Sequence, residues 1–194
     1  MITDIYNTEK RYSIILTDPP WQQGRGNKKK SRPNSSGGGV PYPTMSLQEI
    51  EELHRDVAAR LTTEKHNIFM WTIEKYLTEA EAMMAQAGYR VHARFIWDKV
   101  NGPALAYTVR FAHEYLLWLY KPGQILLPNK TQRGTFSTVF REHVHKQHSR
   151  KPEKSYEIID AMFPGAEKLE LFARRTRSGW DAWGNEVMED SWAT

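Results

Sequence analysis

The chain has 194 residues, of which 40% are hydrophobic and 26% charged, and it contains no cysteine. This length and composition are typical of one globular domain with its own core. They exclude disulfides and thiolate metal sites, and no apolar run reaches the ~20 residues that a membrane-spanning helix needs. Residues 1–13 lack the apolar core of a signal peptide. We therefore expect a single domain over residues 1–194 in a cytoplasmic setting.

Helices and strands are predicted to alternate along the chain. Apolar and β-branched runs predict strands over residues 12–17, 67–72, 91–99, 114–120 and 167–174. Helices are predicted from a capping box at residues 46–49 to residue 61, over residues 74–87, and from Pro152, as the first helical residue, to residue 163. This order predicts an α/β fold: a doubly wound, mostly parallel sheet with helices on both faces. Because ligands bind beyond the carboxyl ends of such strands, Asp18 and Arg174 are expected near one site.

The net charge of +4 is distributed unevenly, with basic residues in three clusters. The clusters are residues 22–41 with Lys28, Lys29 and Lys30, residues 121–147 with Arg133, and residues 174–177. Solvated surface charge explains any one cluster about as well as phosphate contact does. Three clusters in predicted loops favour a polyanionic partner. We predict that the loops at about 22–41 and 121–147 contact nucleic acid, and that the four basic residues named in them bind substrate.

The tetrapeptide DPPW, Asp18 to Trp21, directly follows the first predicted strand. An ionised Asp18 only accepts hydrogen bonds, and Pro19 and Pro20 lack N–H groups, so their carbonyls are acceptors as well. Such a rigid set of acceptors beside an aromatic ring suits an amino group on a flat ring, such as the exocyclic amine of adenine. Holding that amine in line with an activated methyl group would accelerate methyl transfer. A turn that merely ends the strand explains the tetrapeptide alone almost as well.

Further motifs follow DPPW in a fixed order: YPTMS, IFMWT, FIWDK, HEYLLWLY, HSRKP and KLELFARRTRSGWDAWGNE. Over about residues 4–187 this set strongly resembles the DPPW-type adenine-N6 methyltransferases. That family includes the catalytic subunit of the eukaryotic mRNA adenosine methyltransferase and DNA enzymes of bacteria and phages. The resemblance implies a Rossmann-like fold that uses S-adenosylmethionine (SAM), in a permuted order in which the catalytic corner precedes the main cofactor segment.

The resemblance also implies roles for individual residues. The catalytic motif is matched by Asp18, Pro19, Pro20 and Trp21, with Trp21 stacking on the target base and Asp18 also beside the cofactor. A family tyrosine of the target-base pocket is matched by Tyr42. The matched cofactor contacts are Asp4, Ile5, Lys151, Arg174, Arg175, Thr176, Asn185 and Glu186. The segment RRTRSGW is shorter than in the mRNA enzyme, and Ala173 stands where the family often has glycine, so the match leaves open which residue after Arg174 meets the cofactor.

Two other groups of polar residues have a pattern that can indicate function. His143, His145 and His148 have a spacing that metal ligands also use. No carboxylate or thiol completes the set and basic residues interleave, so we predict no metal site and place these histidines near phosphate. Glu114 opens an apolar run, and it is either a pocket residue or half of a structural pair with His113 at a strand end.

These features predict a SAM-dependent, site-specific DNA adenine-N6 methyltransferase of prokaryotic or phage type, since the chain carries no separate RNA-binding module. One alternative is RNA adenine methylation at the same site. Another is a non-catalytic nucleic-acid-binding subunit, against which the intact DPPW argues. Methylation of a glutamine amide or a small amine would leave the basic loops unexplained. A small enzyme without a recognition domain can read DNA as a dimer, so a homodimer is a further expectation.

Overall fold

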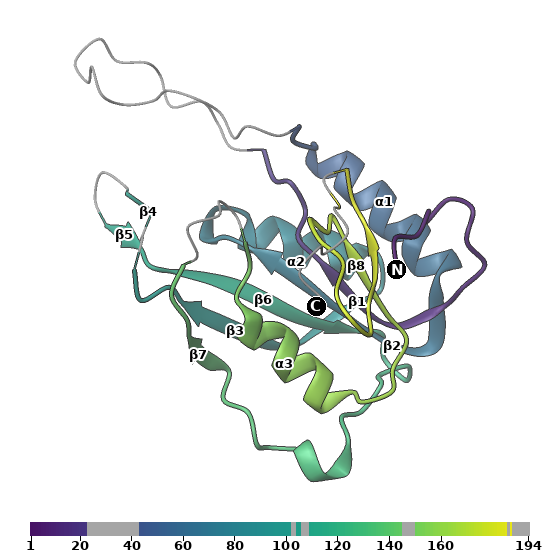
Figure 1. Ribbon diagram of the computed structural model, residues 1–194. Coiled ribbons are helices and arrows are strands. Elements are labelled where there is room, and N and C mark those ends of the chain that lie inside the picture. The colour runs from purple at the N-terminus through teal and green to yellow at the C-terminus, as the bar shows by residue number, and fades with distance from the viewer. Residues whose placement is uncertain (23–42, 102–103, 106–108, 145–149, 186, 188–194) are drawn as a thin grey trace.

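The computed structural model describes residues 1–22, 43–101, 104–105, 109–144, 150–185 and 187 (Figure 1). At its centre lies a seven-stranded sheet with the order β7-β3-β6-β2-β1-β8-β9. These strands are β1 (Tyr12–Thr17), β2 (Thr62–Thr72), β3 (Arg90–Asp98), β6 (His113–Tyr120), β7 (Val139–Arg141), β8 (Lys168–Leu171) and β9 (Asp181–Trp183). Strand β6 is antiparallel to both of its neighbours and the other pairs are parallel. The predicted mostly parallel sheet is therefore confirmed.

Helices cover both faces of this sheet (Figure 1). They are α1 (Leu47–Arg60), α2 (Leu77–Gln86), which follows the 3₁₀ turn η1 (Glu74–Tyr76), and α3 (Glu153–Met162). One hydrophobic cluster packs α1 and α2 against the sheet, and a second packs α3 against the opposite face. The alternation of side chains along β1 explains the two layers, because Ile15 belongs to the first cluster whereas Ile14 and Leu16 belong to the second.

The start of α1 shows how local sequence sets an element. Ser46 Oγ accepts a hydrogen bond from the Glu49 backbone N–H, and a Glu49 carboxylate oxygen accepts from the Ser46 N–H at 2.7 Å. This predicted capping box satisfies two N–H groups that the helix itself leaves without partners. It also fixes where α1 begins relative to Met45, whose N–H donates to the Pro20 carbonyl of the DPPW corner.

Several element boundaries differ from the sequence predictions. Strand β8 ends at Leu171 and does not continue to Arg174, because Phe172 has a φ of 59°, which turns the chain out of the strand. Pro152 is the N-cap of α3 rather than its first helical residue. The predicted loop over residues 121–147 contains the 3₁₀ turn η2 (Lys130–Gln132) and strand β7. A separate hairpin pairs β4 (Ala104–Leu105) with β5 (Arg110–Phe111).

Candidate active site

A cavity of about 460 Å³ lies at the carboxyl ends of the parallel strands β2, β1, β8 and β9. Seven of the predicted site residues line it, namely Asp18, Pro19, Pro20, Trp21, Lys151, Arg174 and Asn185. Glu114 lines it as well, which resolves the choice between a pocket residue and a structural pair in favour of the pocket. The expectation that Asp18 and Arg174 share one site is thus confirmed.

Two carboxylates and two lysines alternate in a chain of ion pairs that begins at this cavity. Lys151 Nζ lies 3.0 Å from Asp18 Oδ1 and 2.8 Å from Glu114 Oε2. Lys99 Nζ lies 2.5 Å from the other oxygen of Glu114. The side chains of Lys151 and Glu114 are each only 13% exposed, so these charges interact through protein rather than through water.

This arrangement sets the charge state of each group. Burial raises the pKa of Asp18, and Lys151 acts in the opposite direction. Burial acts against the charge of Lys151, but Asp18 and Glu114 outweigh it and raise the pKa of the lysine. Burial also works to raise the pKa of Glu114, which Lys151 and Lys99 together lower. The lysine is therefore held as a cation, and Asp18 is the carboxyl of the pair that takes up a proton more readily than usual.

Two backbone hydrogen bonds hold the DPPW corner in place. The Pro19 carbonyl accepts a hydrogen bond from the Trp21 N–H at 2.8 Å, and the Pro20 carbonyl accepts from the Met45 N–H at 3.0 Å. Both carbonyls are therefore acceptors, as predicted, and each already has a backbone partner. Pro20 holds the following chain segment in place, while Pro19 retains a second lone pair that a ligand could use.

Trp21 is fixed in the wall of the cavity. Its side chain is 6% exposed, and its ring stacks on Tyr76 with centroids 5.3 Å apart. Its Nε1 donates to the Trp71 carbonyl at 3.2 Å. Tyr76 covers one face of the ring and the indole N–H anchors the ring to β2, so the stacking of a substrate base on the other face stays a prediction.

The opposite wall of the cavity suits a nucleoside cofactor. The rings of Phe172 and Trp183 meet edge to face at 5.5 Å, and Asn185 supplies an amide beside them. Gly184 makes this wall possible, because a Cβ there would lie 2.3 Å from the Ala173 carbonyl oxygen. Aromatic walls for adenine, carboxylates for an ammonium group and cations for a carboxylate are together the features that SAM needs, so the residues present fit this cofactor.

Several predicted residues are not brought to the cavity. The Asp4 carboxylate accepts from the Tyr6 N–H at 2.9 Å within a surface turn, and Ile5 is fully buried in the core. Neither is among the residues that line the cavity, so the structure does not bring this predicted pair of cofactor contacts to it. Thr176 lies partly buried on the connection between β8 and β9, and Arg175 pairs with Glu153 beside a smaller neighbouring cavity.

Arg133 directly follows η2, on the connection between β6 and β7, and it is not among the residues that line the cavity. It is exposed, and its Nε donates to the Pro128 carbonyl at 3.0 Å. The adjoining Asn129 N–H donates to the Met162 carbonyl at the C-terminal end of α3. This loop folds back against the end of α3 away from Asp18, so the structure does not bring Arg133 to the cavity, and its substrate contact stays a prediction.

Other predicted positions fall outside the described residues. They are Lys28, Lys29, Lys30, Tyr42, His145, His148 and Glu186. Within the described part of the chain, no group of His, Asp and Glu is placed to hold a metal ion. The described residues include no helix that is long and apolar enough to cross a membrane.

Glu170 is a site residue that sequence reasoning missed. It lines the smaller cavity together with Asp18 and Arg174, and it accepts a hydrogen bond from the Tyr156 hydroxyl at 2.7 Å. Burial raises its pKa to about 7. A signal was available, because a carboxylate between Leu169 and Leu171 in a short apolar strand must face a different layer from its neighbours.

At pH values above 7, replacing Glu170 with Gln should raise the melting temperature by a few degrees. Near pH 4 the same replacement should change the melting temperature little. The folded wild type keeps the Glu170 proton up to about pH 7, whereas a free Glu side chain releases it near pH 4.5. Wild-type stability therefore falls between these pH values through this group, and a glutamine avoids that loss. Thermal melts of both proteins at pH 4.5 and pH 8 measure the effect, and a difference that does not grow with pH would contradict it.

Residues 12–186, which include this cavity, match the family model MT-A70. The type II methyltransferase M.MunI of a Mycoplasma species is 32% identical over 195 residues, covering 93% of this chain and 80% of that protein. Human METTL4, an N(6)-adenine-specific methyltransferase, is 26% identical over 95% of this chain, which is 39% of METTL4. The N6-methyladenosine RNA methyltransferase MTA1 of Pyricularia oryzae is 25% identical over 96% of this chain and half of MTA1. The DPPW corner lies at the carboxyl end of β1, the wall that suits a nucleoside cofactor lies opposite it, and the family model matches nearly the whole chain. This protein therefore belongs to the MT-A70 family of SAM-dependent adenine-N6 methyltransferases.

Proposed function

We propose that the protein methylates the exocyclic N6 amine of adenine in DNA, in a site-specific manner. The observation that carries this proposal is the Asp18 carboxylate at the end of β1. It lies in the cavity, is held at 3.0 Å by Lys151 and stands beside the Pro19 carbonyl. A carboxylate and a carbonyl are the two acceptors that the two N–H groups of an adenine amine require.

Each residue of the corner has a chemical task in this proposal. Asp18 and the Pro19 carbonyl accept hydrogen bonds from the amine, which increases electron density on its nitrogen and holds it in line for attack. The amine loses one proton when it gains the methyl group, and the carboxylate of Asp18, whose pKa burial raises, can hold that proton. Lys151 fixes the orientation of this carboxylate. SAM, when bound along Phe172, Arg174 and Asn185, supplies the electrophilic methyl group.

DNA is favoured over RNA as the substrate. Among the relatives named above, the type II methyltransferase M.MunI is matched over the largest share of its own length, 80% against 39% of METTL4 and half of MTA1. MTA1, whose name specifies RNA, supports RNA as the second candidate. Labelled methyl transfer to matched DNA and RNA oligonucleotide pools tests the choice: label in DNA is expected, and label in RNA alone would overturn it. A cytoplasmic setting and a homodimer remain predictions.

Neutralising Lys28, Lys29 and Lys30 with glutamine should weaken DNA binding and make it less sensitive to salt. Each lost phosphate contact reduces the slope of log K against log salt by about 0.9. A matched control removes three charges from exposed residues that do not line the cavity, Lys65, Lys130 and Arg133. Binding titrations at several salt concentrations should separate the two variants, and equal slopes would count against residues 22–41 as the DNA contact.

A further inference from the structure

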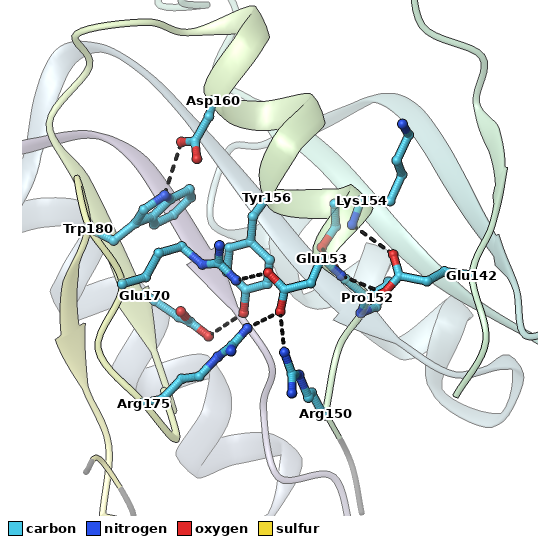
Figure 2. Close-up of polar contacts among 12 residues, drawn as sticks. Glu142, Arg150, Pro152, Glu153, Lys154, Tyr156, Asp160, Glu170, Arg175 and Trp180 are labelled. Atoms are coloured by element: carbon cyan, nitrogen blue, oxygen red, sulfur yellow. Dashed lines mark hydrogen bonds and ion pairs between the residues drawn. The ribbon is translucent and has the colours of Figure 1, made fainter. Parts of the chain in front are cut away.

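The carboxylate of Glu153, the first residue of α3, binds three arginines. Arg150 Nη2 donates to Glu153 Oε1 at 2.8 Å, Arg175 pairs with the same oxygen, and Arg177 pairs with Oε2. Figure 2 shows Arg150 and Arg175 converging on this side chain. Arg150 precedes α3, whereas Arg175 and Arg177 belong to the connection between β8 and β9. One carboxylate therefore joins two segments that are distant in the sequence.

Both of these segments supply residues to the candidate active site. Arg150 is followed directly by Lys151, which holds Asp18, and Arg175 is preceded by Arg174, which lines both cavities. Glu153 is not among the described residues that line the two cavities. Any effect of Glu153 on the site must therefore pass through its arginine partners.

Glu153 is itself held firmly. The two carboxylate oxygens of Glu142 accept hydrogen bonds from the backbone N–H groups of Glu153 and Lys154, at 2.9 and 2.8 Å (Figure 2). The Glu142 carbonyl in turn accepts from Trp97 Nε1 on β3 at 2.8 Å. Since the start of α3 is anchored to the sheet in this way, Glu153 is the fixed partner, and the connection between β8 and β9 is the segment that it holds.

That connection needs such a partner. It leaves β8 through the positive φ of Phe172, and its described backbone hydrogen bonds include Ala173 N–H to the Trp183 carbonyl and Trp180 N–H to the Arg177 carbonyl. The Arg177 guanidinium also lies 3.9 Å from the centre of the Tyr156 ring on α3. Side-chain contacts with α3 therefore do much to hold this segment in place.

The charges of the cluster depend on one another. The Glu153 side chain is 30% exposed, and its three partners are between 21% and 33% exposed, so the ion pairs are only partly screened by water. Burial acts to raise the pKa of Glu153, but the hydrogen bonds from Arg150 and Arg177 outweigh it and lower the pKa to about 2. The carboxylate is thus ionised at any working pH. Without it, three guanidinium groups would face one another and separate.

We propose that Glu153 is a positioning residue for cofactor binding, which fixes Lys151 and Arg174 through Arg150 and Arg175. The proposal rests on the SAM-dependent function proposed above. It reassigns Arg175, which sequence resemblance placed on the cofactor, to a tie between α3 and the segment that carries Arg174. Glu153 itself touches neither cofactor nor substrate.

The test compares Glu153→Gln, Glu153→Asp and the control Glu157→Gln. Glu157 lies one turn further along α3, is 65% exposed and pairs only loosely with Lys154, at 3.5 Å. In ligand-free protein, Glu153→Gln should speed amide hydrogen exchange over residues 172–177 while the rest of α3 stays protected. Its affinity for SAM should fall about tenfold, with a smaller fall in kcat at saturating SAM. Glu153→Asp should recover part of the affinity, and the control should match the wild type.

A double-mutant cycle shows whether the effect passes through the arginines. Adding Arg175→Gln to Glu153→Gln should weaken SAM binding by much less than Arg175→Gln does alone, because the tie is already broken. Unchanged exchange and unchanged SAM affinity in Glu153→Gln, or fully additive losses, would overturn the proposal. A wild type that binds no SAM would instead overturn the proposed function, and the exchange experiment on ligand-free protein would still decide whether Glu153 holds the segment.

Discussion

Asp18→Ala should reduce methyl transfer by about 10²–10⁴-fold, a loss typical of removing a group that handles a proton in the transition state. The variant loses the carboxylate that accepts from the amine and leaves Lys151 paired with Glu114 alone. SAM binding should persist in part, because Phe172, Arg174 and Asn185 still form the other wall of the cavity. Single-turnover transfer from labelled SAM, together with a calorimetric SAM titration, measures both quantities.

The matched control for this variant is Asp56→Ala. Asp56 is a surface residue of α1 whose partner, Arg60, lies four residues along the same helix. Loss of such an exposed pair costs well under about 1 kcal/mol of folding free energy, so this variant should turn over like the wild type. If Asp18→Ala also turned over at the wild-type rate, the role assigned to the DPPW carboxylate would be wrong.

Lys151→Met should destabilise the fold by about 3–5 kcal/mol at neutral pH and abolish activity. The lysine separates two largely buried carboxylates, and removing it takes away the ion pair of Asp18 and leaves Glu114 with Lys99 alone. The loss of stability should shrink as the pH falls, because both carboxylates then take up protons and their repulsion disappears. Urea unfolding of the variant and the wild type at pH 7 and pH 5 measures the difference.

Lys154→Met provides the comparison for this second prediction. Lys154 lies near Lys151 in the chain, but it is half exposed and its ion pair with Glu157 spans 3.5 Å. Its replacement should change the unfolding free energy by less than about 1 kcal/mol. A similar small change in Lys151→Met, or a loss independent of pH, would show that the buried chain of charges does not act as described.

Sequence reasoning succeeded where the determinants are local. The apolar run of β1, the capping box of α1 and the acceptors of the DPPW corner each depend on a few neighbouring residues. The short strands β7 and β9, of three residues each, escaped prediction because pairing at the sheet edges, not an apolar run, defines them. Arg133 is not brought to the cavity for a related reason: charge along the chain does not show where a loop folds back.

The same distinction holds within the candidate site. Lys151 and Asn185 were identified through motifs, and the structure brings both to the cavity. Glu114 was left undecided, because its role depends on Lys99 and Lys151, which lie 15 and 37 residues away in the sequence. Glu153 carried no local signal at all, since its three partners are assembled only by packing α3 against the connection between β8 and β9.

The identity of the methylated atom tests the central claim most directly. Wild-type protein is incubated with SAM bearing a labelled methyl group and unmethylated DNA of mixed sequence, and the DNA is then digested to nucleosides for mass analysis. The account predicts that the label appears as N6-methyldeoxyadenosine. Label on cytosine, or label on adenine at a ring nitrogen, would contradict the assignment of the Asp18 corner to the exocyclic amine of adenine.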